Sequence, residues 1–155
     1  ELARLLNSDP RFTARVSRTT LTESLGTSNA ASLQQRVYLA NSWPADYFVS
    51  IHCNANTNPA VNGTEVYVHQ QNTQAYWLAQ HVLNGVVDAV GTRDNGVRIN
   101  PSLYVLRRTA MPAILVELAY LTNGADALKL RDEQPAFAQG IYHGLLSYFG
   151  FSKEP

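Results

Sequence analysis

Residues 45–56 are the run that most limits how this chain can fold. Their first half is apolar, aromatic or β-branched and has the length of a strand, whereas the last five residues turn abruptly polar. Such a change within one short segment is typical of a buried strand that ends in a functional site.

His52 lies at the end of this predicted strand. Because side chains alternate between the two faces of a strand, Phe48, Ser50, His52 and Asn54 share one face. Cys53 points to the other face, where we expect a buried structural thiol. The carboxyl ends of strands are where open α/β sheets bind ligands, so a neutral imidazole there suits metal binding or proton transfer. The alternative is a core histidine that is hydrogen-bonded to a neighbour.

Length and composition limit the remaining possibilities. The 155 residues have the length of one domain, which can bury about two-thirds of its unfolded surface. Twelve basic and 12 acidic side chains leave no net charge to attract nucleic acid or an anionic membrane. Cys53 is the single cysteine, so it forms no internal disulfide, and no apolar run has the length of a membrane span. We therefore expect neither a nucleic-acid partner nor a membrane span.

Helical and strand patterns alternate along the chain. This alternation predicts a single α/β domain with a mostly parallel twisted sheet flanked by helices. Helices are expected at residues 1–7, 32–40, 76–90, 125–130 and 134–149, and strands at residues 12–20, 45–52, 63–69, 103–106 and 113–117.

Glu117 ends a second strand, which is otherwise fully apolar. If this strand runs parallel to the one that ends at His52, both side chains emerge at the same edge of the sheet. Partial burial of a carboxyl group there raises its pKa toward the range that general acid–base catalysis needs. The alternative is a structural salt bridge between Glu117 and Arg107 or Arg108.

Four ordered blocks resemble the zinc-dependent N-acetylmuramoyl-L-alanine amidases of the Amidase_3 type. The blocks are Ser-Ile-His-Cys-Asn-Ala at 50–55, Gly-Thr-Glu-Val-Tyr at 63–67, Leu-Tyr-Val-Leu-Arg at 103–107 and Pro-Ala-Ile-Leu-Val-Glu at 112–117. With their order and spacing, the resemblance covers essentially the whole chain.

The resemblance implies a bacterial peptidoglycan hydrolase that cuts the amide between N-acetylmuramic acid and the L-alanine of the stem peptide. In this family a zinc ion is held by two histidines and one glutamate, and it activates a water molecule. The resemblance gives His52 the role of the later histidine ligand. It gives Glu117 the role of the general base, which then protonates the leaving amine.

Two further residues are candidates for substrate binding. Asn54 has an amide that can orient the substrate, although asparagines at strand ends also serve turns. Arg107 can bind a carboxylate of the stem peptide through its planar guanidinium, or it can pair with Glu117 or Glu65.

The blocks that carry the first histidine and the glutamate ligand of this family are absent from residues 1–155. We expect an amidase catalytic domain over residues 1–155 that is incomplete at its N-terminus, with the remaining zinc ligands upstream of Glu1. His69, His81 and His143 are expected to be packed or surface histidines rather than ligands.

The sequence thus predicts a monomeric zinc amidase that acts on peptidoglycan in the bacterial cell envelope or outside the cell. The alternative is a non-catalytic peptidoglycan-binding or regulatory module with the same fold and an incomplete metal site.

Overall fold

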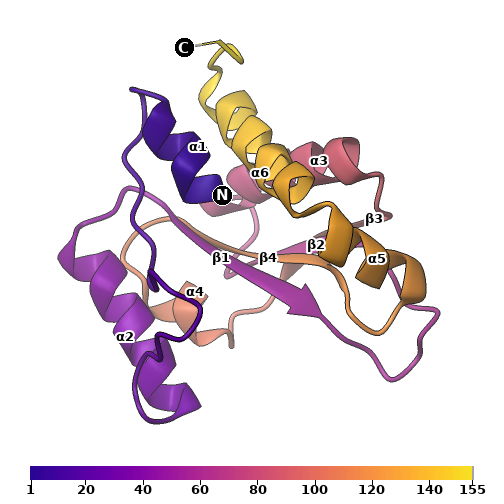
Figure 1. Cartoon of the computed structure of the whole chain (residues 1–155). Coiled ribbons are helices and arrows are strands. Elements are labelled where there is room, and N and C mark those ends of the chain that lie inside the picture. The colour runs from indigo at the N-terminus through magenta and orange to yellow at the C-terminus, as the bar shows by residue number, and fades with distance from the viewer. Residues whose placement is uncertain (155) are drawn as a thin grey trace.

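The computed structural model describes residues 1–154, which form six helices and four strands (Figure 1). The helices are α1 (Leu2–Ser8), α2 (Asn29–Ser42), α3 (Gln74–Val90), α4 (Tyr104–Arg108), α5 (Gly124–Asp132) and α6 (Gln134–Phe149). The strands are β1 (Phe48–Asn54), β2 (Thr64–Val68), β3 (Asp94–Ile99) and β4 (Ala113–Tyr120).

The strands form one mixed sheet in the order β1-β4-β2-β3. β1 pairs with β4 in parallel, as β2 does with β3, whereas β2 and β4 are antiparallel. The predicted α/β domain is confirmed, and two of the three strand pairs have the predicted parallel direction.

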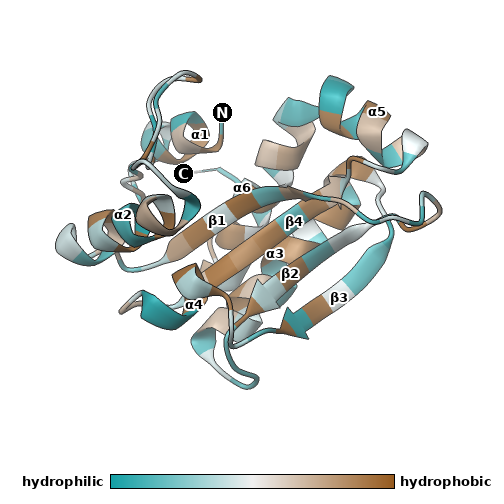
Figure 2. Cartoon of the chain, turned by 90° about the horizontal axis from the view of Figure 1, so that it is seen from below, coloured by the Kyte–Doolittle hydropathy of each residue, from teal (hydrophilic) through white to brown (hydrophobic). Residues whose placement is uncertain are grey.

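Helices cover both faces of the sheet, with α3 and α6 on one side and α2 and α4 on the other (Figures 1 and 2). The larger core lies under α3 and α6 and includes Val66, Val116 and Ile141. A smaller cluster on the other face joins Val37 of α2 and Leu106 of α4 to the sheet. Colouring by hydropathy shows the apolar inner strands between these layers (Figure 2).

Glycines let α3 and α6 pack closely against each other. A Cβ atom added to Gly144 of α6 would lie 2.5 Å from the Cα atom of Val82 on α3. Gly85 and Gly140 face the opposite helix in the same way. This contact therefore leaves no room for side chains at these positions.

Two expected strands are wrong. Residues 12–20 are irregular, and no strand among the described residues pairs with them. The Asn7 side chain instead bonds the backbone N–H and C=O groups of Ala14. Residues 103–106 fall in and just before helix α4. The strand that the sequence did not predict is β3. Its residues are largely polar because it is a partly exposed edge strand, so they lack the apolar pattern of a buried strand.

Two helices begin earlier than predicted because each is capped by a hydroxyl side chain. Ser28 caps α2 by accepting a hydrogen bond from the N–H group of Ala31, and Thr73 caps α3 by accepting one from Tyr76. Within residues 1–154, every helix is too short or too polar to cross a membrane.

Candidate active site

His52 and Glu117 are direct register partners in the parallel pair β1–β4. Glu65 of β2 is the antiparallel partner of Glu117. The three residues therefore form a row across the sheet, on the face that α2 and α4 partly cover. The structure thus brings the two predicted site residues to one edge, together with a second carboxylate.

A bulge in β4 gives this edge a further side chain. The register runs from His52 opposite Glu117 to Asn54 opposite Tyr120, so β4 contains one extra residue. As a result Tyr120 lies on the same face of the sheet as Glu117, although the two residues are three positions apart and strict alternation would put them on opposite faces. Asp126 of α5 secures the end of β4 by accepting a hydrogen bond from the Tyr120 N–H group at 2.9 Å.

Glu65 is the anchor of the polar network at this edge. Its side chain is 1% exposed, and its Oε1 atom accepts hydrogen bonds from Asn54 Nδ2 and from the Tyr120 hydroxyl, both at 2.6 Å. Its Oε2 atom lies 2.7 Å from Nε of Arg98 on β3. One buried carboxylate thus ties together β1, β3 and β4.

Sequence reasoning missed this role of Glu65 and its partners Tyr120 and Arg98. The signal that could have found it is a carboxylate in the middle of the β-branched run at 63–68. Such a group is costly to bury unless it is paired.

Glu117 is half-buried, and its Oε2 atom is buried without a hydrogen-bond partner among the described residues. Burial, followed by the nearby charge of Glu65, raises the pKa of Glu117 from 4.5 to about 7. A carboxyl group with this pKa can both accept and donate a proton near neutral pH.

His52 is also half-buried, and its Nε2 atom lies 3.0 Å from Ser50 Oγ. Burial and the positive charge of Arg36 on α2 lower the pKa of His52. Both effects favour the neutral imidazole, which is the form that acts as a metal ligand or proton acceptor.

The two substrate-binding candidates have different surroundings. Asn54 donates to Glu65 and accepts from the Ala55 N–H group at 2.9 Å, so both ends of its amide are engaged within the protein. Arg107 is exposed on α4, with its guanidinium carbon 5.9 Å from the centre of the Tyr104 ring. Within residues 1–154 it forms no salt bridge with Glu117 or Glu65.

The prediction that Cys53 is buried is wrong, because this side chain is exposed. It lies on β1, which is one of the two edge strands, and Ile51 on the same face of this strand is 45% exposed for the same reason. The helices α3 and α6 cover the central strands and leave this end of β1 open.

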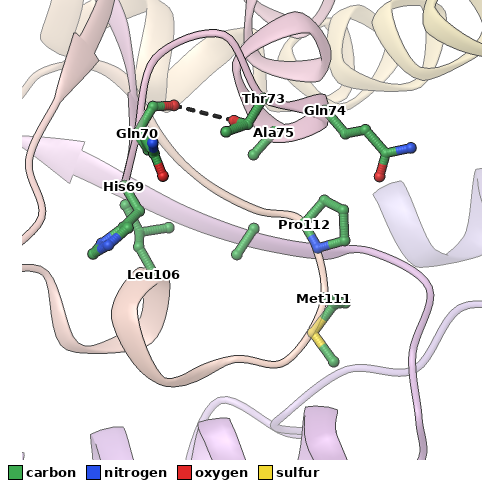
Figure 3. A pocket seen from close by; sticks show the side chains of 9 residues that line it. His69, Gln70, Thr73, Gln74, Ala75, Leu106, Met111 and Pro112 are labelled. Atoms are coloured by element: carbon green, nitrogen blue, oxygen red, sulfur yellow. Dashed lines mark hydrogen bonds between the residues drawn. The ribbon is translucent and has the colours of Figure 1, made fainter.

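The other three histidines lie away from this edge. His81 and His143 lie on α3 and α6 and contact Ser147 and Gln139, respectively, at 2.8 Å. His69 lines a cavity of about 240 Å³ beside Pro112, at the opposite rim of the sheet, before β4 begins (Figure 3).

The zinc site that the family resemblance implies takes three protein ligands. Among the described residues, no three histidine, cysteine, aspartate or glutamate side chains are placed to hold a metal ion together. Of these ligands, the resemblance assigns one to His52. The residues present therefore do not form that site by themselves.

Comparison with known proteins decides the family. The profile of the N-acetylmuramoyl-L-alanine amidase family (Amidase_3) matches residues 1–147. The chain belongs to this family.

Curated relatives agree with this assignment. The chain is 40% identical over 122 residues to the N-acetylmuramoyl-L-alanine amidase LytC of Bacillus subtilis, a match that covers 76% of this chain and 24% of LytC. It is 36% identical over 154 residues to the amidase CwlM of Bacillus licheniformis, covering 96% of this chain and 56% of CwlM. The amidase-family chain thus spans from about a quarter to just over half the length of these two relatives.

Solved structures share the fold. The N-acetylmuramoyl-L-alanine amidase of Clostridium difficile 630 superposes with a TM-score of 0.85 at 38% identity, over 98% of this chain and 79% of that one. The catalytic domain of CwlV from Paenibacillus polymyxa gives a TM-score of 0.83 at 33% identity, over 97% of this chain and 80% of the other.

Proposed function

We propose that this amidase-family domain hydrolyses the amide bond between N-acetylmuramic acid and L-alanine in bacterial peptidoglycan. The observation that carries the proposal is the pairing of His52 with Glu117 at one sheet edge, where a buried oxygen of Glu117 has no hydrogen-bond partner within residues 1–154. An unpartnered carboxylate oxygen at an open edge suits proton exchange with water and substrate.

Glu117 performs the proton transfers in this proposal. As a carboxylate it removes a proton from the water molecule whose oxygen attacks the amide carbonyl carbon. The protonated Glu117 then gives that proton to the amide nitrogen as the carbon–nitrogen bond breaks. The products are the carboxylic acid of the muramoyl lactyl group and the free amine of L-alanine.

The proposal assigns only one of the zinc ligands to a residue of this chain. We propose His52 as one ligand of a zinc ion. A zinc site of this kind takes three protein ligands, so activation of the attacking water by zinc would depend on two ligands that no other residue in 1–154 is placed to supply. The steps assigned to Glu117 rest on this chain alone.

The proposed substrate implies where in the cell the enzyme acts. We propose that it acts as a monomer on the cell wall, in the bacterial cell envelope or outside the cell. A relative in Staphylococcus aureus carries the name "probable cell wall amidase LytH" and is 33% identical over 106 residues.

The test is hydrolysis of purified cell walls by the full-length protein, measured as newly formed N-terminal alanine. Wild-type protein should release alanine amino groups, and Glu117→Ala should not, with circular dichroism showing that the variant is folded. Undiminished activity of Glu117→Ala would remove the assigned base. Binding to walls without release of amino groups would instead support a non-catalytic module.

A further inference from the structure

A polar cavity of about 470 Å³ lies between the N-terminal half of α2 and the segment that precedes this helix. Arg18 and Arg36 line it together with hydroxyl side chains that include Ser28 and Ser32. Glu23 is the one acidic residue in the lining. The cavity therefore carries an excess of positive charge and hydrogen-bond donors.

This cavity adjoins the edge that holds His52. Helix α2 runs back against the direction of β1 (Figure 1), and near its C-terminus Asn41 bonds the backbone of Arg108 and Ala110, just before β4 begins. The N-terminal half of α2 therefore lies toward the carboxyl ends of β1 and β4.

Among the described residues, neither arginine forms a salt bridge, although the charge of Arg18 acts on nearby Glu23 and helps to lower its pKa. Within residues 1–154, neither Arg18 nor Arg36 lies within salt-bridge distance of a carboxylate, and the buried Nε atom of Arg36 has no hydrogen-bond partner. Glu23 is already engaged, because it accepts hydrogen bonds from the Thr19 N–H group at 2.6 Å and the Thr19 hydroxyl at 2.9 Å. A buried guanidinium N–H without a partner is costly, which points to a ligand oxyanion.

We propose that this cavity binds a free carboxylate on the peptide side of the substrate, through Arg36 and Arg18. The inference rests on the proposed function, because it places the scissile amide at His52 and Glu117. An extended peptide advances about 3.3–3.6 Å per residue, so a carboxylate on the second or third peptide residue lies within about 10 Å of that amide. Arginine is suited to the task because its planar fork binds a carboxylate through two hydrogen bonds.

Binding to a Glu117→Gln form of the full-length protein tests the proposal without turnover. The two probes are N-acetylmuramoyl-L-alanyl-D-glutamate and its neutral counterpart, in which both carboxylates of the glutamate are converted to carboxamides. Calorimetry should show the carboxylate compound binding about tenfold more tightly, as expected for a charge-assisted hydrogen bond. A second substitution, Arg36→Gln, should remove this preference and leave the affinity for the neutral compound unchanged.

Two further variants, one inside the cavity and one far from it, test whether the preference depends on this cavity. Arg18→Gln alters an exposed loop residue and should reduce the preference several-fold, whereas Arg131→Gln, on the distant helix α5, should leave it intact. Equal affinity of the Glu117→Gln protein for both compounds would overturn the proposal, as would a preference that survives Arg36→Gln. Tighter binding of inorganic phosphate than of N-acetyl-D-glutamate would also overturn it in favour of a phosphate site. Each of these results is independent of whether Glu117 is the catalytic base.

Discussion

His52 of β1 and Glu117 of β4 stand directly opposite each other in a parallel strand pair, although they are far apart along the chain. Glu65 of β2 takes the next place in the same row. Since neighbouring strands lie about 4.8 Å apart, the sheet itself sets the spacing of an imidazole and two carboxyl groups. The proton-transfer properties of Glu117 follow from this row, because Glu65 contributes to the raised pKa of Glu117.

The raised pKa of Glu117 predicts the pH dependence of the activity. A general base must be deprotonated, so kcat/KM should rise with pH through about 7 and then level off. Glu65→Gln removes a negative charge beside Glu117 and should shift this rise to lower pH. The measurement is the pH–rate profile of both proteins on the same cell-wall substrate. Profiles with the same midpoint would show that Glu65 does not influence the base.

The same shift predicts how stability changes with pH. The folded protein holds the Glu117 proton more tightly than the unfolded chain does, with a pKa of about 7 against 4.5. The free energy of unfolding should therefore fall as pH rises through this window, relative to a Glu117→Gln variant that cannot titrate. Urea unfolding of both proteins at pH 4.5 and pH 8 measures the difference, and the titration of His52 cancels in the comparison. A constant difference between the two proteins would contradict the raised pKa.

Tyr120→Phe tests the network around Glu65. The substitution removes the 2.6 Å hydrogen bond to Glu65 Oε1 and keeps the aromatic ring. Because the acceptor is a buried charged group, the free energy of unfolding should drop by about 1.5–3 kcal/mol. Thermal unfolding measures the loss, and Tyr38→Phe, at a position that is 69% exposed, is the matched control. Equal melting temperatures for the two variants would count against the network.

Gly144→Ala tests the close packing of α3 and α6. An added methyl group would lie 2.5 Å from the Val82 Cα atom, so the helices must move apart. Overpacking of this kind costs about 1–3 kcal/mol in the free energy of unfolding, which chemical denaturation can measure. Gly124→Ala at the start of α5 meets no atom within 4 Å and should leave stability nearly unchanged.

The sequence was informative wherever one apolar run specified a buried element. The strands that end at His52 and Glu117 could be recognised by their runs of apolar residues, although only the second of them, β4, is an inner strand. Their meeting at one edge could be expected from the parallel direction alone. The polar edge strand β3 could not be recognised, because neighbouring backbone rather than apolar side chains defines it.

The polar network around Glu65 could not be predicted from the sequence, for a different reason. Glu65 meets Glu117 only through the antiparallel register of β2 and β4, which no local pattern encodes. Tyr120 meets Glu65 only because of an extra residue in β4, which interrupts the alternation on which sequence reasoning relies.

That extra residue has a consequence for protein engineering. A mutant library designed on strict strand alternation would treat Tyr120 as packing against α3 and α6, and would vary it among apolar residues. Its hydroxyl instead belongs to the reactive edge. Apolar replacements at position 120, chosen to redesign the hydrophobic interior, would instead remove a hydrogen bond to Glu65 and so change the reactive edge.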